Sequence, residues 1–224
     1  MTKWLKANDF RYKKPHGVPA KAARERQEDF IEYYNELKEK AGKNEPIYFN
    51  DSTHPHHQTQ LAYGWIFKGE RKTIARTACQ RHLNYMGALN LDGHKIVTSQ
   101  VDKVNGESIQ TFLKKLRQQH PNDRKIHIIW DNAGYHRSKE VKSRAEALNI
   151  KLHYLPPYSP NLNPIERLWK IMHEQVSYNK YYPDFKSFRN ALTHFFRNIG
   201  KKKKLLRTRL SDNFHIIDEP NFAS

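Results

Sequence analysis

The chain has 224 residues, enough for one substantial domain with an appendage or for two small domains. Hydrophobic residues make up 37% of it and aromatic residues 12%, a composition that excludes an intrinsically disordered chain. The formal net charge of +17 favours nucleic acid as the partner, because a small protein with that excess repels itself unless a polyanion neutralises it. A merely soluble basic protein is the alternative.

Cysteine usage and hydropathy bear on the compartment. The single cysteine, Cys79, excludes an intrachain disulfide framework and a cysteine-rich zinc site, and it fits a reducing environment. The first ten residues are polar and charged, unlike a signal peptide, and no apolar stretch approaches the length of a membrane span. We therefore expect a soluble, cytoplasmic protein with no membrane partner.

Residues 1–44 differ from the rest of the chain. Residues 4–19 are basic and have no clear period, whereas Lys21–Lys40 is a charged, helix-favouring run with its apolar residues on one face. Gly42 is suited to end that helix. We expect a short helical N-terminal extension that is either a linker helix or the tail of a domain whose front is absent.

From residue 45 the pattern alternates between strands and helices. Short apolar runs predict strands at 47–49, 63–67, 85–91, 95–101, 126–130 and 151–155. One-face spacing predicts helices around 109–116, after Ser138, over 165–176 and after Asp184. This order indicates an α/β domain in which helices flank a mixed β-sheet.

Three details of this domain follow from local sequence. Asp92-Gly93 predicts a two-residue hairpin turn between two of the strands. The run Ile126–Trp130 is almost continuously apolar, which predicts a strand buried on both faces. Trp65 and Trp169 stand among apolar neighbours, so we expect both in the core rather than on a surface that stacks with bases.

Three acidic residues require a specific explanation. Asp51 and Asp131 each follow a predicted strand, and a desolvated carboxylate is costly without a cation or hydrogen-bond donors. Ligands gather at the carboxyl ends of neighbouring strands, although each aspartate can instead cap a loop. Glu166 has its own alternative, because Asn163-Pro164-Ile165-Glu166 fits a capping box with the glutamate at the third helical position.

Three such carboxylates in a basic protein suit metal-dependent chemistry on DNA. Carboxylate oxygens are hard ligands for Mg²⁺ or Mn²⁺. Two such ions can activate a nucleophile and stabilise the leaving oxygen of an in-line phosphoryl displacement. The positive surface would attract the DNA, and the ions would offset the charge of the phosphate.

Four segments of the chain resemble the catalytic domain of DDE transposases, in particular the bacterial insertion-sequence branch of the Tc/mariner superfamily. They are YFNDSTHPHH, AYGWIFKG, IIWDNAGYHRS and LPPYSPNLNPIERLWK. The resemblance covers about residues 46–196. Thirty-four residues lie between Asp131 and Glu166, a spacing typical of this superfamily, and the last two segments together are specific.

The resemblance implies a ribonuclease H-like fold and assigns Asp51, Asp131 and Glu166 to catalysis and metal binding, with Mg²⁺ or Mn²⁺ as the cofactor, two ions in all. It implies cut-and-paste transposition, in which a strand is hydrolysed at the element's end and the freed 3′-hydroxyl attacks target DNA at a TA dinucleotide. Asn132 and His136 match the motif around the second aspartate, and we expect them to support the ligands or the DNA backbone.

The expected partners and compartment follow from the same resemblance. Double-stranded DNA, as transposon ends and target, is the partner, and a homodimer is expected when the protein is assembled on it. The location would be the bacterial cytosol or nucleoid. Two alternatives remain: a hydrolysis-only nuclease of the same fold, and a non-enzymatic or inactive DNA-binding remnant.

The domain boundaries complete these expectations. We assign residues 45–200 to the catalytic domain and residues 201–224 to a basic C-terminal tail. That tail is either simply solvated or contacts DNA phosphates through Lys201, Lys202, Lys203, Lys204 and Arg207.

Intact family members carry an N-terminal helix-turn-helix region, of which only the end fits here. Residues 1–44 are therefore a linker helix with a remnant of that region, from a truncated copy or from the second half of a two-frame product. The sequence leaves open the transposon end sequence, the oligomeric state and activity of the chain alone.

Overall fold

The computed structural model describes residues 2–11, 23–77, 79–122 and 125–217, and a five-stranded mixed sheet forms its centre. The strands are β1 (Ile47–Thr53), β2 (Asn84–Asn90), β3 (Lys95–Val101), β4 (Ile126–Trp130) and β5 (Ile150–Tyr154). Their order across the sheet is β3-β2-β1-β4-β5. The β1–β2 and β2–β3 pairs are antiparallel, and the β1–β4 and β4–β5 pairs are parallel.

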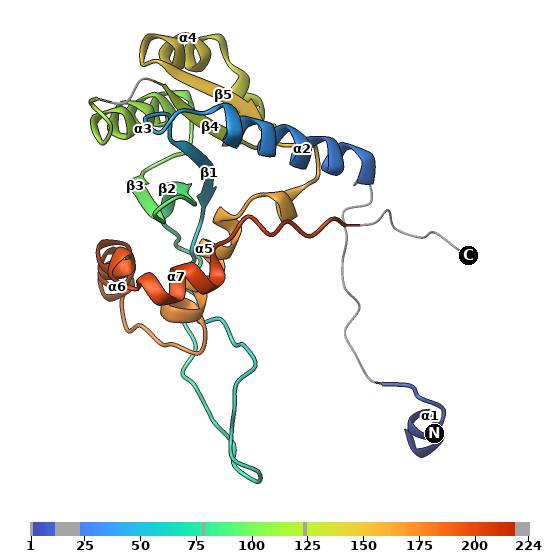
Figure 1. The fold of residues 1–224 in the computed structure, drawn as a ribbon. Coiled ribbons are helices and arrows are strands. Elements are labelled where there is room, and N and C mark those ends of the chain that lie inside the picture. Colours follow the sequence, from blue (N-terminus) through green and yellow to red (C-terminus); the bar gives the residue numbers. More distant parts are fainter. Residues whose placement is uncertain (1, 12–22, 78, 123–124, 218–224) are drawn as a thin grey trace.

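Helices cover both faces of the sheet (Figure 1). The α-helices of the described chain are α1 (Thr2–Ala7), which lies apart from the sheet, α2 (Arg24–Lys40), α3 (Gly106–Gln118), α4 (Lys139–Ala147), α5 (Ile165–Met172), α6 (Phe185–Asn198) and α7 (Lys203–Arg209). The apolar sides of α3 and α4 pack on one face, and α2, α5 and α6 pack on the other, whereas α1 buries no residue. Among the described helices, none is both long and apolar enough to cross a membrane.

The period of two along each strand explains this layering, because neighbouring residues point to opposite faces of a sheet. Tyr48 of β1 packs with the apolar residues of α3 and α4, while the next residue, Phe49, packs with Phe30 and Tyr34 of α2. Every residue of β4 is buried, which confirms the strand that its continuous apolar run predicted.

Helix caps that the sequence predicted are confirmed. The side chain of Ser138 accepts a hydrogen bond from the backbone N–H of Val141 at 3.3 Å at the start of α4. Asp184 accepts from the backbone N–H of Ser187 at 2.7 Å at the start of α6. Each cap satisfies a backbone donor that the first helical turn leaves without a partner.

Two strand ends differ from expectation. β1 continues to Thr53, so Asp51 lies within the strand instead of after it, because residues 49–53 pair with β2. The connection of β2 to β3 has four residues, Leu91 to His94, instead of two. Gly93 and His94 adopt positive φ angles of 75° and 54°, which let the chain reverse direction within this four-residue loop.

The segment between β1 and β2 is where the sequence prediction is wrong. Residues 61–77, which we call the arm, contain no helix or strand and project from the domain (Figure 1). The predicted strand at 63–67 does not form, because no neighbouring strand pairs with it. Trp65 is fully exposed, so its expected place in the core is also wrong, whereas Trp169 is buried as expected.

Segments outside the predicted catalytic domain pack closely against it. α2 buries Phe30 and Tyr34 against the sheet, and the side chain of Gln27 exchanges hydrogen bonds with the backbone of Ile217 at 2.9 and 3.0 Å. Leu206 and Leu210 are buried in the same cluster as α5 and α6. Residues 201–217 are therefore part of the packed structure and not a free tail.

Candidate active site

Parallel pairing of β1 with β4 brings two of the three candidate carboxylates to the same end of the sheet. Phe49 and Ile129 are ladder partners; Asp51 stands two residues further along β1, and Asp131 is the first residue after β4. Residues two apart on a strand share a face, so Asp51 lies on the face on which Phe49 packs, the one that α5 covers. Asp131 lies at the same end of the sheet, in the loop that follows β4.

Glu166 reaches this end of the sheet from the first turn of α5. The helix begins at Ile165, and the side chain of Asn163 accepts a hydrogen bond from the backbone N–H of Ile165 at 3.4 Å, so half of the predicted capping box forms. The backbone N–H of Asn163 donates to the carbonyl of Pro160 at 2.9 Å and not to Glu166, so the reciprocal half does not. Asn163 Nδ2 also donates a hydrogen bond to the carbonyl of Asn50 in β1, at 3.2 Å. This bond ties the start of α5 to the strand that carries Asp51.

Asp51 is contacted by α5 and by β2. The indole N–H of Trp169 donates a hydrogen bond to Asp51 Oδ2 at 2.9 Å. The residue opposite Asp51 in the β1–β2 ladder is Gly87. Sequence periodicity identified Trp169 as a core residue, and its hydrogen bond to the carboxylate had no signal in the sequence.

Asp131 is held by the loop that follows β4. His136 Nδ1 lies 2.7 Å from Asp131 Oδ1, and the backbone N–H of Ala133 donates to the same oxygen at 3.1 Å. The buried His136 ring stacks on Trp130 with a centroid distance of 4.4 Å. The hydrogen bond from His136 is the main reason that the pKa of Asp131 is lowered, because it stabilises the ionised carboxylate.

The other two carboxyl groups have raised pKa values. Desolvation first, and then the charges of Glu166 and Asp131, raise the pKa of Asp51 to about 7, while the Trp169 hydrogen bond opposes this rise. Desolvation and then the charge of Asp131 raise the pKa of Glu166. The charge of Asp131 thus disfavours ionisation of Asp51 and Glu166, and a bound cation would relieve that repulsion.

Asp51 and Glu166 line a cavity of about 430 Å³, whose lining does not include Asp131. The other side chains with ionisable or aromatic groups in its wall are His54, Trp169, Lys170, His173 and Tyr178. Lys170 and His173 follow Glu166 by four and seven residues, spacings that share one helix face. The apolar period that predicts this helix carries no signal for these two residues.

The donor set fits a hard divalent cation. In the described parts of the chain, no three His, Cys, Asp or Glu side chains converge as a ready-formed metal site. Asp51 and Glu166 nevertheless offer carboxylate oxygens to one cavity, and Asp131 lies close enough to affect the pKa of both. Magnesium commonly takes only one or two carboxylates together with water and substrate phosphate.

Asn132 does not contact the carboxylates. Its Nδ2 donates a hydrogen bond to the carbonyl of Leu155, and its Oδ1 accepts one from Arg137. These contacts connect the loop after β4 to the end of β5. Asn132 therefore shapes the loop on which Asp131 and His136 lie.

The predicted DNA-binding residues divide between two places. Lys201–Lys204 are exposed, and Lys202 donates to the side chain of Gln175, in the turn that extends α5. Arg209 also forms an ion pair with Glu174 of that turn at 2.9 Å. Arg207 instead lines a separate cavity of about 880 Å³ beside the first residues of β1, so the structure does not bring it to the carboxylates.

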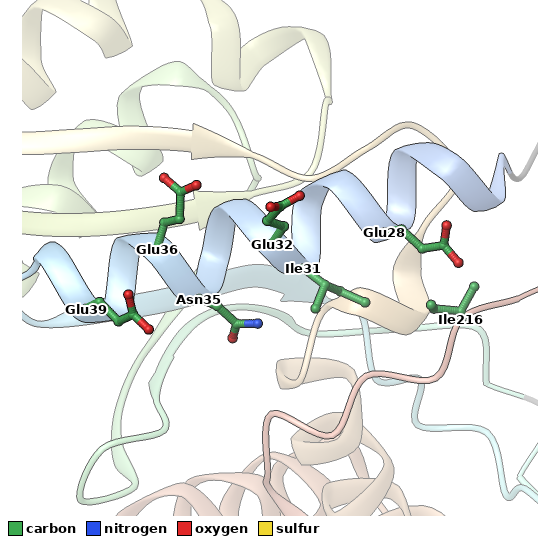
Figure 2. A pocket seen from close by; sticks show the side chains of 7 residues that line it. All are labelled: Glu28, Ile31, Glu32, Asn35, Glu36, Glu39 and Ile216. Atoms are coloured by element: carbon green, nitrogen blue, oxygen red, sulfur yellow. The ribbon is translucent and has the colours of Figure 1, made fainter.

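The outer face of α2 has the opposite charge. Figure 2 shows a shallow pocket there whose lining carries the carboxylates of Glu28, Glu32, Glu36 and Glu39. Such a face repels phosphate, so DNA is not expected along it. The positive charge of the chain is therefore unevenly distributed, and the exposed lysines near the extension of α5 are the more favourable surface for a polyanion.

Two curated proteins are similar to the chain in sequence. An insertion element IS630 protein of Shigella sonnei, an uncharacterized 39 kDa protein, is 23% identical over 156 residues, which cover 69% of this chain and 46% of that protein. An uncharacterized protein of Sinorhizobium fredii (strain NBRC 101917 / NGR234) is 32% identical over 88 residues, covering 39% of this chain and 61% of that protein. The chain thus spans about half the length of the curated relatives it matches.

Solved structures of the Mos1 mariner transposase share the fold. The Mos1 strand transfer complex matches with a TM-score of 0.64 at 16% identity, covering 96% of this chain and 70% of that chain. The catalytic domain of Mos1 matches with a TM-score of 0.54 at 15% identity, covering 92% and 100%. These matches confirm the ribonuclease H-like mixed sheet flanked by helices that the sequence resemblance implied.

A family model described as DDE superfamily endonuclease matches residues 46–189, a range that begins just before β1 and ends within α6. It includes all five strands and the three carboxylates. Together with the IS630 and mariner similarities, this match confirms the resemblance to the insertion-sequence branch of the Tc/mariner superfamily. The chain belongs to the DDE superfamily endonuclease family.

Proposed function

We propose that this chain is the catalytic part of a DNA transposase, which cleaves DNA at transposon ends and joins the freed ends to target DNA. The observation that supports it most is that Asp51 and Glu166 line one cavity, while the parallel pairing of β1 with β4 puts Asp131 at the same end of the sheet. Membership of the DDE endonuclease family and the transposase fold support it. Insertion at TA sites is part of the proposal.

The three carboxylates would hold the divalent metal, as two Mg²⁺ or Mn²⁺ ions. Mos1 complexes solved with Mn and with Mg support the choice of cation. Such ions, when bound, supply nucleophile activation and charge stabilisation for an in-line displacement at phosphorus. For this chain, β1 and α5 orient Asp51 and Glu166, while His136 keeps Asp131 ionised and fixes its orientation.

Double-stranded DNA is the proposed partner, as transposon ends and as target. The Mos1 strand transfer complex and the Mos1 paired-end complex with a left transposon end support that choice and a homodimer assembled on the DNA. Lys170 and His173 would contact phosphates beside the carboxylates, and Lys201–Lys204 would extend that surface along the chain. Such a protein would act in the bacterial cytosol or nucleoid.

End recognition is proposed to lie outside the catalytic unit, residues 45–200. Residues 1–44 would then be the linker helix and remnant of an N-terminal DNA-binding region. α2 packs on the sheet, which fits a linker that transmits the position of such a region to the active site.

Strand transfer tests the proposal directly. The wild-type chain, Glu166→Gln and Glu140→Gln are incubated with Mg²⁺ or Mn²⁺, a pre-nicked transposon-end duplex and supercoiled plasmid. Glu140 is the matched control, because it is an exposed glutamate on α4 and not part of the cavity lining. We expect joined products from the wild type and from Glu140→Gln but none from Glu166→Gln.

The other outcomes separate the alternatives. Metal-dependent cleavage without joining would favour the hydrolysis-only nuclease. DNA binding without cleavage or joining would favour the inactive DNA-binding protein. Joining by Glu166→Gln at the wild-type rate would remove Glu166 from the site.

Salt dependence tests the role of the basic run. Each phosphate contact contributes about 0.9 to the slope of log affinity against log salt for duplex DNA. We therefore expect Lys203→Gln with Lys204→Gln to reduce the slope, measured by fluorescence anisotropy, by about 1 to 2. The matched control is Lys139→Gln with Lys142→Gln on α4, whose lysines are exposed but remote from the cavity lining. Equal slopes for the two double variants would contradict a specific role for Lys203 and Lys204.

A further inference from the structure

The hydrogen bond between Trp169 and Asp51 couples α5 to β1 at the carboxylate itself. Trp169 is only 4% exposed, and a buried indole N–H usually has an acceptor. It donates to Asp51 Oδ2 at 2.9 Å, and a carboxylate acceptor makes such a bond stronger and more directional than a neutral one. A planar ring donating to one oxygen restricts rotation of the whole carboxylate.

The indole has room because the strand beneath it carries a glycine. A Cβ atom on Gly87 would lie 2.4 Å from Cη2 and 2.9 Å from Cζ2 of Trp169, distances that real structures do not tolerate. Gly87 is not among the described glycines with positive φ, so backbone conformation does not explain it. Glycine weakens a strand interior, and close approach of another group is the usual reason for its presence.

A second hydrogen bond fixes α5 on the other side of Glu166. Asn163, three residues before Glu166, donates to the carbonyl of Asn50 at 3.2 Å, and Trp169, three residues after it, donates to Asp51. Two adjacent residues of β1 are thus tied to the two ends of the turn that carries Glu166. These bonds set the position of Glu166 relative to Asp51.

Packing leaves the Trp169 ring little freedom to move. Its edge lies against Phe196 of α6, with centroids 6.2 Å apart and planes at 84°. Trp169 also belongs to the cluster of buried residues that joins α5 and α6. Packing against α6 therefore helps to fix the orientation of the indole N–H that donates to Asp51.

We propose that Trp169 is a positioning residue for the metal-binding carboxylate of Asp51, and that residue 87 is glycine in order to admit the indole ring. This inference rests on the proposed function in one respect, the role of Asp51 as a metal ligand. Removing the partner that orients a metal ligand typically weakens metal binding by about 10- to 100-fold. We expect that loss from Trp169→Phe, which keeps an aromatic ring but removes the N–H.

Mn²⁺ binding to the full-length chain tests the inference without using activity. The electron paramagnetic resonance signal of free Mn²⁺ gives the dissociation constant for wild type, Asp51→Asn, Trp169→Phe and Phe188→Leu. Phe188 is the matched control, because it is buried in the same cluster as Trp169 and is absent from the cavity lining. We expect about 10-fold weaker binding for Trp169→Phe and an unchanged constant for Phe188→Leu.

Gly87→Ala provides an independent test of the same inference. Alone, it should weaken Mn²⁺ binding as Trp169→Phe does, because its methyl group displaces the indole. In the Trp169→Phe background it should add little, since the smaller ring lacks the outer atoms that the methyl group meets, and the remaining close neighbour, Ile165 Cδ1 at 3.2 Å, is the end of a flexible side chain. Additive effects of the two substitutions would overturn the claim that Gly87 acts through Trp169.

The failures are distinguishable. If Asp51→Asn binds Mn²⁺ as well as the wild type, Asp51 is not a ligand and the proposed function loses that assignment. If Asp51→Asn loses binding while Trp169→Phe retains it, the positioning role is wrong and the proposed function stands. A loss for Phe188→Leu equal to that for Trp169→Phe would assign the effect to general destabilisation and overturn the inference.

Discussion

The layer between β1 and α5 and the arm at residues 61–77 both contain a tryptophan among apolar neighbours, yet the two environments are opposite. Trp169 is buried, packed against Phe196 and hydrogen-bonded to a carboxylate, whereas Trp65 is fully exposed. Apolar residues are buried only where another element supplies a surface, and the arm has none. Exposed apolar side chains gathered on one segment are characteristic of interaction surfaces.

The largest expected effect lies in the carboxylate layer. Asp131→Asn should reduce DNA strand cleavage by at least about 10³-fold, because several kcal/mol of metal-dependent stabilisation would be lost. Its DNA affinity should stay within a few-fold of the wild type. Glu70→Gln, an equivalent change on the arm, is the control and should cleave normally. Cleavage gels and fluorescence anisotropy measure the two quantities, and normal cleavage by Asp131→Asn would exclude this residue from the site.

Substitutions in the two regions should also differ in their effect on the free energy of unfolding. Phe188→Ala should lower the free energy of unfolding by about 3–5 kcal/mol, because Phe188 is 1% exposed and its removal leaves a cavity. Trp65→Ala should change it by less than about 0.5 kcal/mol, because the ring already lies in water. Urea denaturation measures both changes. A large loss for Trp65→Ala would mean that the arm folds back onto the domain.

A smaller effect is expected on acidification. Burial lowers the pKa of His153 to about 4, and its ring contacts Tyr33 Oη at 2.5 Å and His127 at 2.9 Å. The folded state therefore binds fewer protons than the unfolded state, so stability should fall as the pH falls from about 6.5 to 4. His153→Gln should remove about 2 kcal/mol of this acid sensitivity. The exposed His82, changed to Gln, is the control, and melting curves that respond equally in both variants would refute the explanation.

The smallest effect should be a gain in stability from Asp51→Asn. Because the pKa of Asp51 is raised to about 7, mainly by desolvation, the folded state holds this proton more tightly than the unfolded state. Ionisation of Asp51 therefore lowers the free energy of unfolding. This loss grows as the pH rises from the ordinary aspartate range to about 7, and it is complete above that pH. At pH 8 without metal, Asp51→Asn should therefore be more stable by about 1–2 kcal/mol. An equal gain for Glu70→Gln would assign the effect to overall charge.

The elements of the fold could be predicted where the apolar residues that form a periodic pattern in the sequence are also the residues buried in the structure. The buried residues of α3 and β4 follow the helical and continuous patterns in the sequence, and Ser138 and Asp184 mark helix starts by their own hydrogen bonds. The alternating apolar residues of the arm carry the same signal without a partner strand. Pairing depends on residues far away in the sequence, and a local period contains no information about them.

The motifs predicted the carboxylates and His136, but not the contact that the fold adds from α5. The spacing of Asp131 and Glu166 belongs to a specific motif, and His136, which matches the same motif, contacts Asp131. The hydrogen bond from Trp169 to Asp51 joins residues 118 positions apart, and no local pattern contains it. The predicted cap at the start of α5 forms in part: the side chain of Asn163 accepts from the backbone N–H of Ile165, while its own backbone N–H donates to Pro160. The same side chain also donates to the carbonyl of Asn50, a tertiary contact that the local pattern does not contain.

The parallel pairing of β1 with β4 also has a consequence for folding. It joins residues 47–49 to residues 127–129, so roughly eighty residues of chain must close into a loop before Asp51 and Asp131 can meet. Such long-range pairings form late relative to the local hairpin of β2 and β3. A partly folded chain without this pairing would lack two neighbouring carboxylates, so the candidate site would form only after β1 and β4 have paired.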